Sequence, residues 1–304
     1  MCVIKHFDDL ASFAKNAKNR VLAVAAAQDA DVLQGVEFAR KQGVAYAILV
    51  GDADKIKSIA AHHGIDLKNY EILHETDNQQ GCEKAAALIA EGRAHIFMKG
   101  LVDTAVALKA LLNKEYRLRT DRLLSHVSIF KMAQYDRLIF VTDPAINPAP
   151  DLEQKRQIIE NAVALAQVFG VPRPYVAPVC AVEKPNPKMQ ASVHAEALSE
   201  MNKSDEIKGC FVSGTVSLDV ALEPGAAKQK GYAGEIGGKA DILLAPNIEA
   251  GNILHKSIVY FGGGQMAGVT MGLKCPVVMT SRADSKYAKL YSIAAAAVIS
   301  EQGA

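Results

Sequence analysis

The turn Thr280-Ser281-Arg282-Ala283-Asp284-Ser285 carries a hydroxyl, a guanidinium and a carboxylate within four residues. It follows a short apolar run and precedes an Ala-rich helical pattern over 286–300. A strand that breaks into a polar turn and then a helix directs free backbone N–H groups at one spot. Arg282 can bind phosphate bidentately, Ser281 can donate a hydrogen bond and Asp284 can accept a proton. These residue types predict a phosphate site with a base beside it.

The same turn also fits an ordinary junction between a strand and a helix. Asp284 would then cap the last helix, and Arg282 would be a surface side chain. Polar turns of this length are common, so the turn by itself leaves both interpretations open.

A second segment combines a lysine with the start of a helix. Lys99 ends the apolar run 94–99, Gly100 follows it, and a helical pattern begins at Thr104. An ammonium beside free helical N–H groups is suited to holding an anion. The alternative is a solvated lysine beside a helix cap formed by Asp103.

A third segment places an amide and an ammonium on one predicted helix. After the apolar run 240–245, Gly251 permits a close backbone approach and Asn252 offers both a donor and an acceptor. Lys256 lies four residues beyond Asn252 and hence on the same helix face. An ordinary strand–loop–helix junction explains this segment equally well.

A fourth polar turn, Ser213-Gly214, also follows an apolar run, and it lacks the G-x-S-x-G pattern of a serine hydrolase. In open α/β sheets, ligands bind outside the carboxyl ends of the strands. Since turns after strands need Gly, Ser and Asp in any case, no single turn identifies a site.

The composition is that of a soluble globular protein. Of the 304 residues, 50% are hydrophobic and 22% are charged, and a net charge of +1 does not indicate nucleic-acid binding. No apolar run is long enough to cross a membrane and no signal peptide is apparent, so a cytoplasmic protein is expected. The five cysteines are scattered without a CxxC pair, and His62-His63 has no third ligand at a useful spacing. Neither a disulfide framework nor a metal site is therefore expected.

Strand-like and helix-like stretches alternate along the sequence. Strands are expected at 20–26, 45–51, 70–74, 94–99, 124–130, 137–142, 175–182, 209–213, 240–245 and 277–280, and helices at 30–42, 79–91, 104–113, 152–169, 187–201, 251–261 and 286–300. Many strand candidates are apolar throughout, as strands covered on both faces should be. The alternation predicts an α/β protein with a mostly parallel sheet. Three prolines within 143–150 form a stiff connector, which we take as the first domain boundary.

Several segments occur together and in a fixed order. They are Met98-Lys99-Gly100, Leu118-Arg119-Thr120 with Leu124-Ser125-His126-Val127, Val212-Ser213-Gly214, Ala240-Asp241-Ile242-Leu243-Leu244-Ala245-Pro246, Glu249-Ala250-Gly251-Asn252-Ile253 and the turn 280–285. In this order they resemble the phosphate acetyl/butyryltransferase family over essentially the whole chain, and its butyryl branch more closely than its acetyl branch.

The resemblance implies the fold of the isocitrate and isopropylmalate dehydrogenases, in which two α/β domains with mostly parallel sheets flank a cleft. It also implies that the last strand and helix return to the first domain. We therefore expect a first domain of 1–142 plus 276–304 and an inserted second domain of 143–275. Family members are usually dimers or larger, so a homodimer or higher homo-oligomer is expected.

The implied reaction interconverts acyl-CoA plus phosphate with acyl phosphate plus CoA, with butyryl-CoA as the expected acyl donor. CoA and phosphate are substrates, and no further cofactor or metal is required, because neither redox change nor phosphoryl transfer occurs. In the direction of CoA acylation the thiol must lose its proton before it attacks. Phosphate then leaves, and an arginine that holds it stabilises the developing charge.

Carried over residue by residue, the resemblance makes Arg282 the phosphate-binding arginine and Ser281 its neighbouring serine. In the acetyltransferase branch the catalytic aspartate lies seven residues after that serine, where this chain has Ala288. Asp284 is the nearest carboxylate, and we take it as the base by hypothesis. The other residues expected to bind phosphate or acyl-CoA are Lys99, Gly100, Thr104, Ser213, Gly214, Gly251, Asn252, Lys256 and Ser285.

Three alternatives remain open at this point. The first is a phosphate acetyltransferase, since one methylene changes discrimination by only about 1–3 kcal/mol. The second is an NAD- and metal-dependent decarboxylating dehydrogenase, which the implied fold allows but whose acidic metal ligands and arginine-rich substrate helix are not found. The third is a non-catalytic CoA-binding subunit, in which Arg282 and Asp284 are purely structural.

Overall fold

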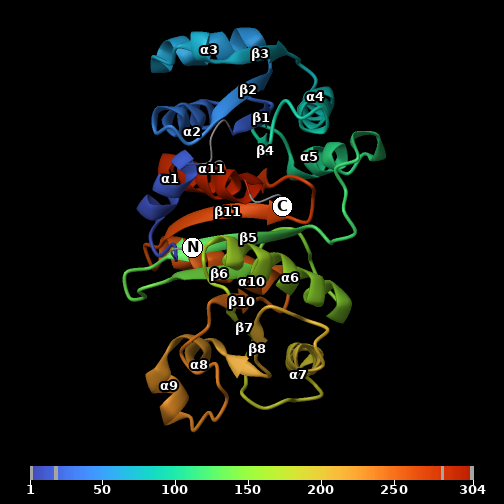
Figure 1. The fold of residues 1–304 in the computed structure, drawn as a ribbon, viewed down its shortest axis with the longest axis vertical. Coiled ribbons are helices and arrows are strands. Elements are labelled where there is room, and N and C mark those ends of the chain that lie inside the picture. Colours follow the sequence, from blue (N-terminus) through green and yellow to red (C-terminus); the bar gives the residue numbers. More distant parts are fainter. Residues whose placement is uncertain (1–2, 17–19, 282–283, 302–304) are drawn as a thin grey trace. The chain divides into compact units, whose positions relative to one another are not determined.

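The computed structural model of the chain describes residues 3–16, 20–281 and 284–301. Their internal contacts divide the chain into two units (Figure 1). Unit 1 comprises Met1–His6 and Leu123–Gln265, and unit 2 comprises Phe7–Arg122 and Met266–Ala304. The predicted domain boundaries at 142/143 and 275/276 do not coincide with the unit boundaries, and the division into those domains stays a prediction.

Unit 2 alternates strands and helices, apart from the strand pair that precedes its last helix. Its elements are α1 (Phe7–Asn16), β1 (Val21–Ala25), α2 (Ala30–Lys41), β2 (Tyr46–Gly51), α3 (Ala53–His63), the 3₁₀ turn η1 (Leu67–Asn69), β3 (Glu71–His74), α4 (Asn78–Ala90), β4 (Ile96–Lys99), α5 (Thr104–Leu111), η2 (Lys114–Tyr116), β11 (Gln265–Met271, whose first residue falls in unit 1), β12 (Val277–Val278) and α11 (Lys286–Glu301).

The strands of unit 2 lie in the order β3-β2-β1-β4-β12-β11. Each pair from β3 to β12 is parallel, and β11 runs antiparallel to β12. The pairing of β12 with β4 places a strand from near the end of the chain beside a strand that contains Phe97. Strand neighbours that are parallel have their carboxyl ends at one edge of the sheet, which is where a ligand is expected.

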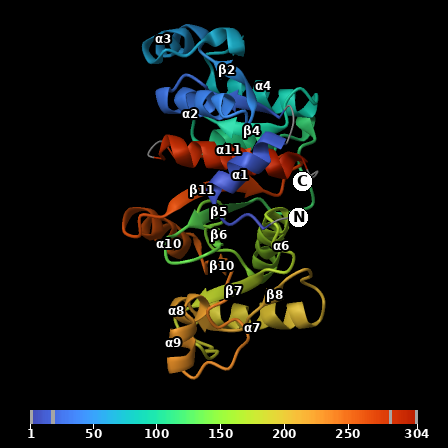
Figure 2. The ribbon, with the colours of Figure 1, turned by 60° about the vertical axis from the view of Figure 1, so that its left-hand side comes forward.

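Helices cover the strands of unit 2. Helix α4 packs on β1, β2 and β4, while α11 packs against α1, α2 and β12 (Figures 1 and 2). Phe7 of α1 stacks on Tyr291 of α11 with ring centroids 4.5 Å apart. Because strands such as β4 are covered on both faces, Phe97 and Met98 are both fully buried.

Unit 1 has a second, mostly parallel set of strands. Its elements are β5 (Ser125–Lys131), β6 (Leu138–Thr142), α6 (Leu152–Val168), β7 (Tyr175–Cys180), α7 (Gln190–Lys203), β8 (Phe211–Val212), β9 (Val216–Ser217), α8 (Leu218–Leu222), α9 (Pro224–Gln229), β10 (Ile242–Leu244) and α10 (Ile248–Tyr260). The strands lie in the order β5-β6-β10-β7-β8, with β9 paired to the end of β7. Only the β5–β6 pair among these described pairs is antiparallel.

Short polar side chains start many of the helices. Asp29, Asp52, Asp77, Asp151 and Asn247 each accept a hydrogen bond from a backbone N–H in the first turn of the helix that follows. Such caps satisfy N–H groups that have no partner within the helix. At α6 the cap follows the proline-rich stretch directly, and Gln154 completes a reciprocal capping box. The predicted helix start near Asp151 is therefore confirmed.

The α/β prediction is confirmed, and every expected strand and helix is present at its place in the chain. A helix end is also expected at His62-His63, and α3 ends there. The elements that were not predicted are α1, β9, α8, α9, β11 and the 3₁₀ turns η1 and η2. Of these, β11 matters most, because it pairs with β12 and so forms part of the frame around the predicted phosphate turn.

Candidate active site

Two of the predicted site segments lie side by side in unit 2. Strands β4 and β12 are parallel neighbours, with Phe97 opposite Val277 and Met98 opposite Val278. Lys99 ends β4, and Ser281 follows β12 by three residues. The sheet thus brings two segments together that are more than 170 residues apart in the sequence.

A cavity of about 430 Å³ opens at this edge of the sheet. It is lined by Lys99, Val102, Asp103, Thr104, Met279, Thr280 and Ser281. Its polar groups are one ammonium, the Asp103 carboxylate and three hydroxyls, beside the amino-terminal end of α5. The Lys99 ammonium, the hydroxyl donors and the helix N-terminus suit a tetrahedral oxyanion such as phosphate.

Local backbone contacts hold the ammonium of Lys99 at the cavity. Its Nζ donates to the carbonyl oxygens of Val102 at 2.9 Å and Gly100 at 3.3 Å. Gly100 itself packs so closely on the end of β1 and the residue after it that an added Cβ would lie 2.3 Å from the Ala26 carbonyl oxygen. Glycine is therefore required at this turn for steric reasons, whether or not it also contacts a ligand.

Ser281 and Asp284 are joined by two hydrogen bonds. The Ser281 N–H donates to Asp284 Oδ2 at 2.7 Å, and the Asp284 N–H donates to the Ser281 carbonyl at 3.2 Å. Asp284 does not act as the first-turn cap of α11, because Ser285 Oγ accepts the Ala288 N–H at 3.1 Å. The alternative role for Asp284 as a simple helix cap is therefore wrong, and Ser285 has that role. Arg282, the predicted phosphate-binding arginine, lies outside the described residues.

In unit 1, Gly251 and Asn252 lie in the first turns of α10. The helix begins at Ile248, three residues earlier than expected. A Cβ on Gly251 would lie 2.8 Å from the Asp143 carbonyl oxygen, and Asn252 Nδ2 donates to the Pro144 carbonyl at 3.2 Å. Both residues therefore fix α10 against the proline-rich loop. Lys256 is exposed farther along the same helix.

Ser213 and Gly214 follow the short strand β8. Ser213 is buried, and its hydroxyl donates to the Gly214 carbonyl at 3.0 Å. An added Cβ on Gly214 would lie 2.7 Å from Glu196 Oε1, the oxygen that also accepts hydrogen bonds from Thr215. The turn is thus held tightly at the carboxyl end of its strand.

Asp103 is a site residue whose role local sequence did not predict. It precedes α5, yet its carboxylate makes no hydrogen bond to the first turn of that helix, and it lines the cavity instead. Any function of the cavity therefore has a second carboxylate to consider beside Asp284. The structure also places Met279 and Thr280 at the same wall.

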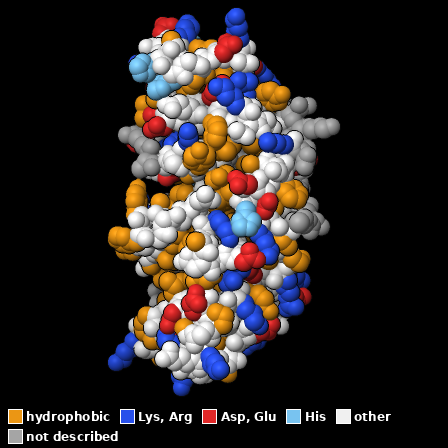
Figure 3. All heavy atoms as spheres, turned by 90° about the vertical axis from the view of Figure 1, so that its left-hand side faces the viewer, with side chains coloured by type: hydrophobic (Ala, Val, Ile, Leu, Met, Phe, Trp, Pro, Cys, Tyr) orange, Lys and Arg blue, Asp and Glu red, His pale blue; other side chains and the backbone are white. Residues whose placement is uncertain are grey.

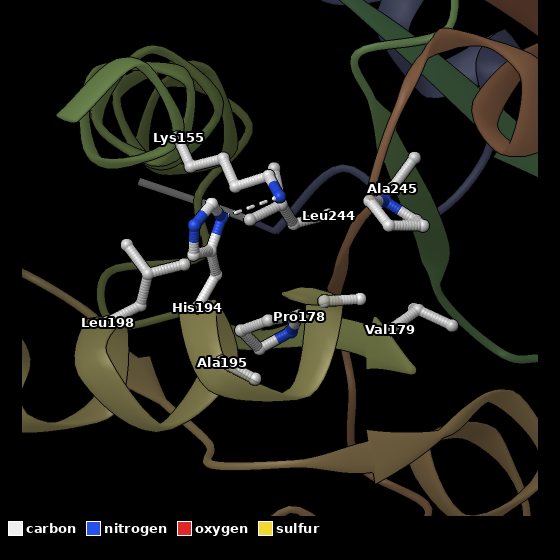
Figure 4. A pocket seen from close by; sticks show the side chains of 10 residues that line it. Lys155, Pro178, Val179, His194, Ala195, Leu198, Leu244 and Ala245 are labelled. Carbon is white, nitrogen blue, oxygen red and sulfur yellow. Dashed lines mark hydrogen bonds between the residues drawn. The ribbon is translucent and has the colours of Figure 1, made fainter. Parts of the chain in front are cut away.

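A second polar cluster, absent from the sequence-based predictions, lies in unit 1 (Figure 4). Lys155 of α6 is buried, and its Nζ lies 3.0 Å from Nδ1 of His194 on α7. Pro178, Leu244 and Ala245 form apolar walls around the pair. Burial lowers the pKa of the Lys155 amine, and burial together with the neighbouring Lys155 lowers the pKa of His194. The adjoining cavity has a volume of about 10 Å³, close to that of one water molecule.

Among the described residues, no group of three or more His, Cys, Asp or Glu side chains could hold a metal ion. Within the same residues, no helix combines the length and the apolar character that a membrane crossing requires.

Known proteins resemble this chain over nearly its full length. The family model described as phosphate acetyl/butaryl transferase matches residues 75–297. A phosphate butyryltransferase from Clostridium acetobutylicum is 46% identical, over 98% of this chain and 99% of its own. A phosphate acetyltransferase from Thermotoga maritima is 39% identical, over 92% of this chain and 95% of its own. A solved branched-chain phosphotransacylase from Enterococcus faecalis V583 superposes with a TM-score of 0.81 at 31% identity, covering 92% of this chain and 99% of its own. The similarity therefore extends over both units.

Proposed function

Because the chain belongs to the phosphate acetyl/butyryltransferase family, we propose that it interconverts butyryl-CoA plus phosphate with butyryl phosphate plus CoA. The observation that carries this proposal is the cavity at the ends of β4 and β12, where Lys99, Thr104 and Ser281 meet. Its ammonium and hydroxyl donors suit inorganic phosphate, the substrate that every reaction of this class shares.

The proposed chemistry assigns one task to each group of the turn. In the direction of acyl phosphate formation, a phosphate oxygen attacks the acyl carbonyl carbon and the CoA thiolate leaves. In the reverse direction Asp284 takes the thiol proton, the thiolate attacks, and Arg282 with Ser281 holds the departing phosphate. Lys99, Gly100, Thr104 and Ser285 of unit 2 are proposed to bind phosphate or acyl-CoA. The same proposal covers Ser213, Gly214, Gly251, Asn252 and Lys256 of unit 1.

A second candidate is phosphate acetyl transfer. It is favoured by the 39% identity with the acetyltransferase from Thermotoga maritima, whereas the butyryltransferase from Clostridium acetobutylicum is 46% identical. The two activities differ by two methylenes of the acyl chain, each worth about 1–3 kcal/mol in a fitted pocket. We therefore expect butyryl-CoA to be the better substrate and acetyl-CoA to react more slowly.

The test is phosphate-dependent release of free thiol from acetyl-, propionyl-, butyryl- and isobutyryl-CoA, followed with a thiol reagent. We expect the highest kcat/KM with butyryl-CoA and no release without phosphate. Lys99→Met should raise the KM for phosphate, and Lys109→Met, which removes an exposed lysine of α5, is the matched control. Thiol release that is absent with all four substrates would refute the proposal. That result would favour a non-catalytic CoA-binding subunit. Reduction of NAD in the presence of 2-hydroxy acids would instead identify a dehydrogenase.

The wider expectations form part of the same proposal. We propose an isocitrate dehydrogenase-like division into two domains, a cytoplasmic location, no cofactor beyond the substrates, and a homodimer or higher homo-oligomer. Exposed apolar side chains on α10 and the residue after it support association (Figure 3). Ile253, Tyr260 and Phe261 are 66%, 66% and 91% exposed. Large apolar side chains that gather on a surface in this way often mark a site of protein–protein contact. Light scattering of the wild type and of Phe261→Ser tests this point.

A further inference from the structure

Lys289 is a buried lysine close to the predicted phosphate turn. It lies in α11 and is 1% exposed. Its Nζ donates a hydrogen bond of 2.5 Å to the main-chain carbonyl of Asp284. Among the described residues, no carboxylate lies within ion-pair distance of this ammonium. Its charge is therefore directed at the turn and is not neutralised by an acidic partner in the described part of the chain.

An ammonium at this position is costly to the fold. Removing a charge from water is unfavourable unless other groups replace its hydration, and apolar side chains of similar volume often serve the fold as well or better. The one described hydrogen bond of Lys289 Nζ leads to the turn and not to another part of the core. This arrangement indicates a role for the lysine in holding the turn.

Gly35 of α2 provides a second, independent observation. A Cβ built at Gly35 would lie 2.9 Å from Cδ and 3.0 Å from Cβ of Lys289. Glycine inside a helix is less favourable than alanine, so its presence in α2 needs a local reason. Passage of the Lys289 stem is that reason. The absence of a Cβ at Gly35 thus leaves room between α2 and α11 for the Lys289 side chain, whose ammonium reaches the Asp284 carbonyl.

We propose that Lys289 is a positioning residue for phosphate binding, a role that rests on the proposed function of the cavity. Lys289 holds the carbonyl of Asp284, the carboxylate of Asp284 holds the Ser281 N–H, and Ser281 lines the cavity. Through these contacts the buried lysine fixes Ser281 relative to Lys99 on the neighbouring strand. Lys289 itself does not contact substrate.

The first test compares Lys289→Met with Lys286→Met. Methionine keeps an unbranched stem but removes the donor and the charge. Lys286 lies on the same helix but is exposed, with its Nζ over the ring of Phe38, so its substitution removes the same charge without the hydrogen bond. Lys289→Met should raise the KM for phosphate about tenfold, with the KM for butyryl-CoA unchanged. Lys286→Met should leave both KM values near those of the wild type.

Gly35→Ala is the second test, and it keeps the lysine. Helix propensity alone predicts that this variant is more stable than the wild type. If Gly35 acts through Lys289, the variant instead raises the KM for phosphate, because the added methyl displaces the stem. The double variant Gly35→Ala/Lys289→Met should then be no worse than Lys289→Met alone.

Hydrogen exchange of the Ser281 amide provides a readout that does not need catalysis. We expect faster exchange in Lys289→Met and Gly35→Ala than in Lys286→Met. The proposal is overturned if both variants fold and keep wild-type exchange at Ser281 and wild-type KM for phosphate. Should Lys289→Met fail to fold, Gly35→Ala decides by the same two measurements. A wild type that shows no phosphate-dependent thiol release would refute the proposed function alone, and the exchange experiment would still test the hold of Lys289 on the turn.

Discussion

Asp284 and Ser281 bind each other reciprocally, through a carboxylate that accepts the Ser281 N–H at 2.7 Å and an N–H that returns to the Ser281 carbonyl at 3.2 Å. A carboxylate held in this way has a defined orientation, which a general base requires. The same contact would also shape the turn if Asp284 never accepted a proton. The two roles can be separated by experiment.

Asp284→Asn should lower kcat for CoA acylation by about 10²–10⁴-fold if Asp284 is the base. The amide keeps an oxygen that can accept the Ser281 N–H, so the turn is preserved while the basic group is removed. Steady-state rates with butyryl phosphate and CoA measure the effect. Asp103→Asn is the matched variant, since Asp103 is the other described carboxylate at this site. If Asp103→Asn abolished CoA acylation and Asp284→Asn left its rate normal, the base would be Asp103 and not Asp284.

Gly100→Ala should destabilise unit 2 by about 1–3 kcal/mol, because the new Cβ would lie 2.3 Å from a backbone oxygen that has little freedom to move. Urea unfolding measures the change in free energy. Gly225→Ala is the control, since a Cβ at Gly225 meets no atom within 4 Å and this residue lies within α9. Equal unfolding free energies for the two variants would contradict the steric argument.

Acid should weaken the fold through His126. Burial, with a smaller contribution from His255, lowers the pKa of His126 from 6.5 to about 3. Below pH 6.5 the unfolded chain binds a proton at this residue that the folded chain excludes, so stability falls with falling pH. The advantage of the wild type over His126→Gln should shrink by about 2 kcal/mol between pH 7 and pH 5. Parallel pH curves for His126→Gln and the wild type would exclude this account.

Lys155 should make the fold more stable as the pH rises above 7. Burial lowers the pKa of Lys155 from 10.5, so the buried ammonium costs stability at neutral pH, and this cost disappears as the pH rises towards 10.5. Relative to Lys155→Met, the wild type should therefore gain stability as the pH rises from 7 through the lowered pKa of Lys155 and past 10.5. Lys228→Met on α9 removes an exposed lysine and serves as the control. A constant difference between the wild type and Lys155→Met would be the contrary result.

The junctions that carry the site could be predicted from the sequence because their chemistry is local. An apolar run, a glycine or serine, and a helical pattern follow one another at Lys99-Gly100 and at Ser281, and each junction forms as expected. The pairing of β4 with β12 is not local, and only the family resemblance indicated that the last strand returns to the first part of the chain. The sequence pattern did contain a signal for α1, since Phe7, Leu10 and Ala14 have helical spacing and are buried.

Residues whose role depends on a distant partner could not be predicted. Lys289 is a charged residue in an Ala-rich helix, and its sequence neighbours do not indicate that it is buried. Its burial depends on the packing of α2 on α11, which brings Gly35 against its side chain. Lys155 and His194 come from separate helices and meet only in the folded unit. Asp103 has the position of a helix cap, and only the folded structure shows that its carboxylate lines the cavity without capping α5.

The pairing of β12 with β4 also has a consequence for synthesis on the ribosome. Phe97 of β4 pairs with Val277 of β12, which is synthesised 180 residues later (277 − 97). At translation rates of about 5–20 residues per second, that delay is on the order of 10–40 seconds. During this interval the apolar edge of β4 is without its final cover. On the nascent chain that edge of β4 is therefore an unpaired strand edge, the kind of edge with which another extended segment can pair.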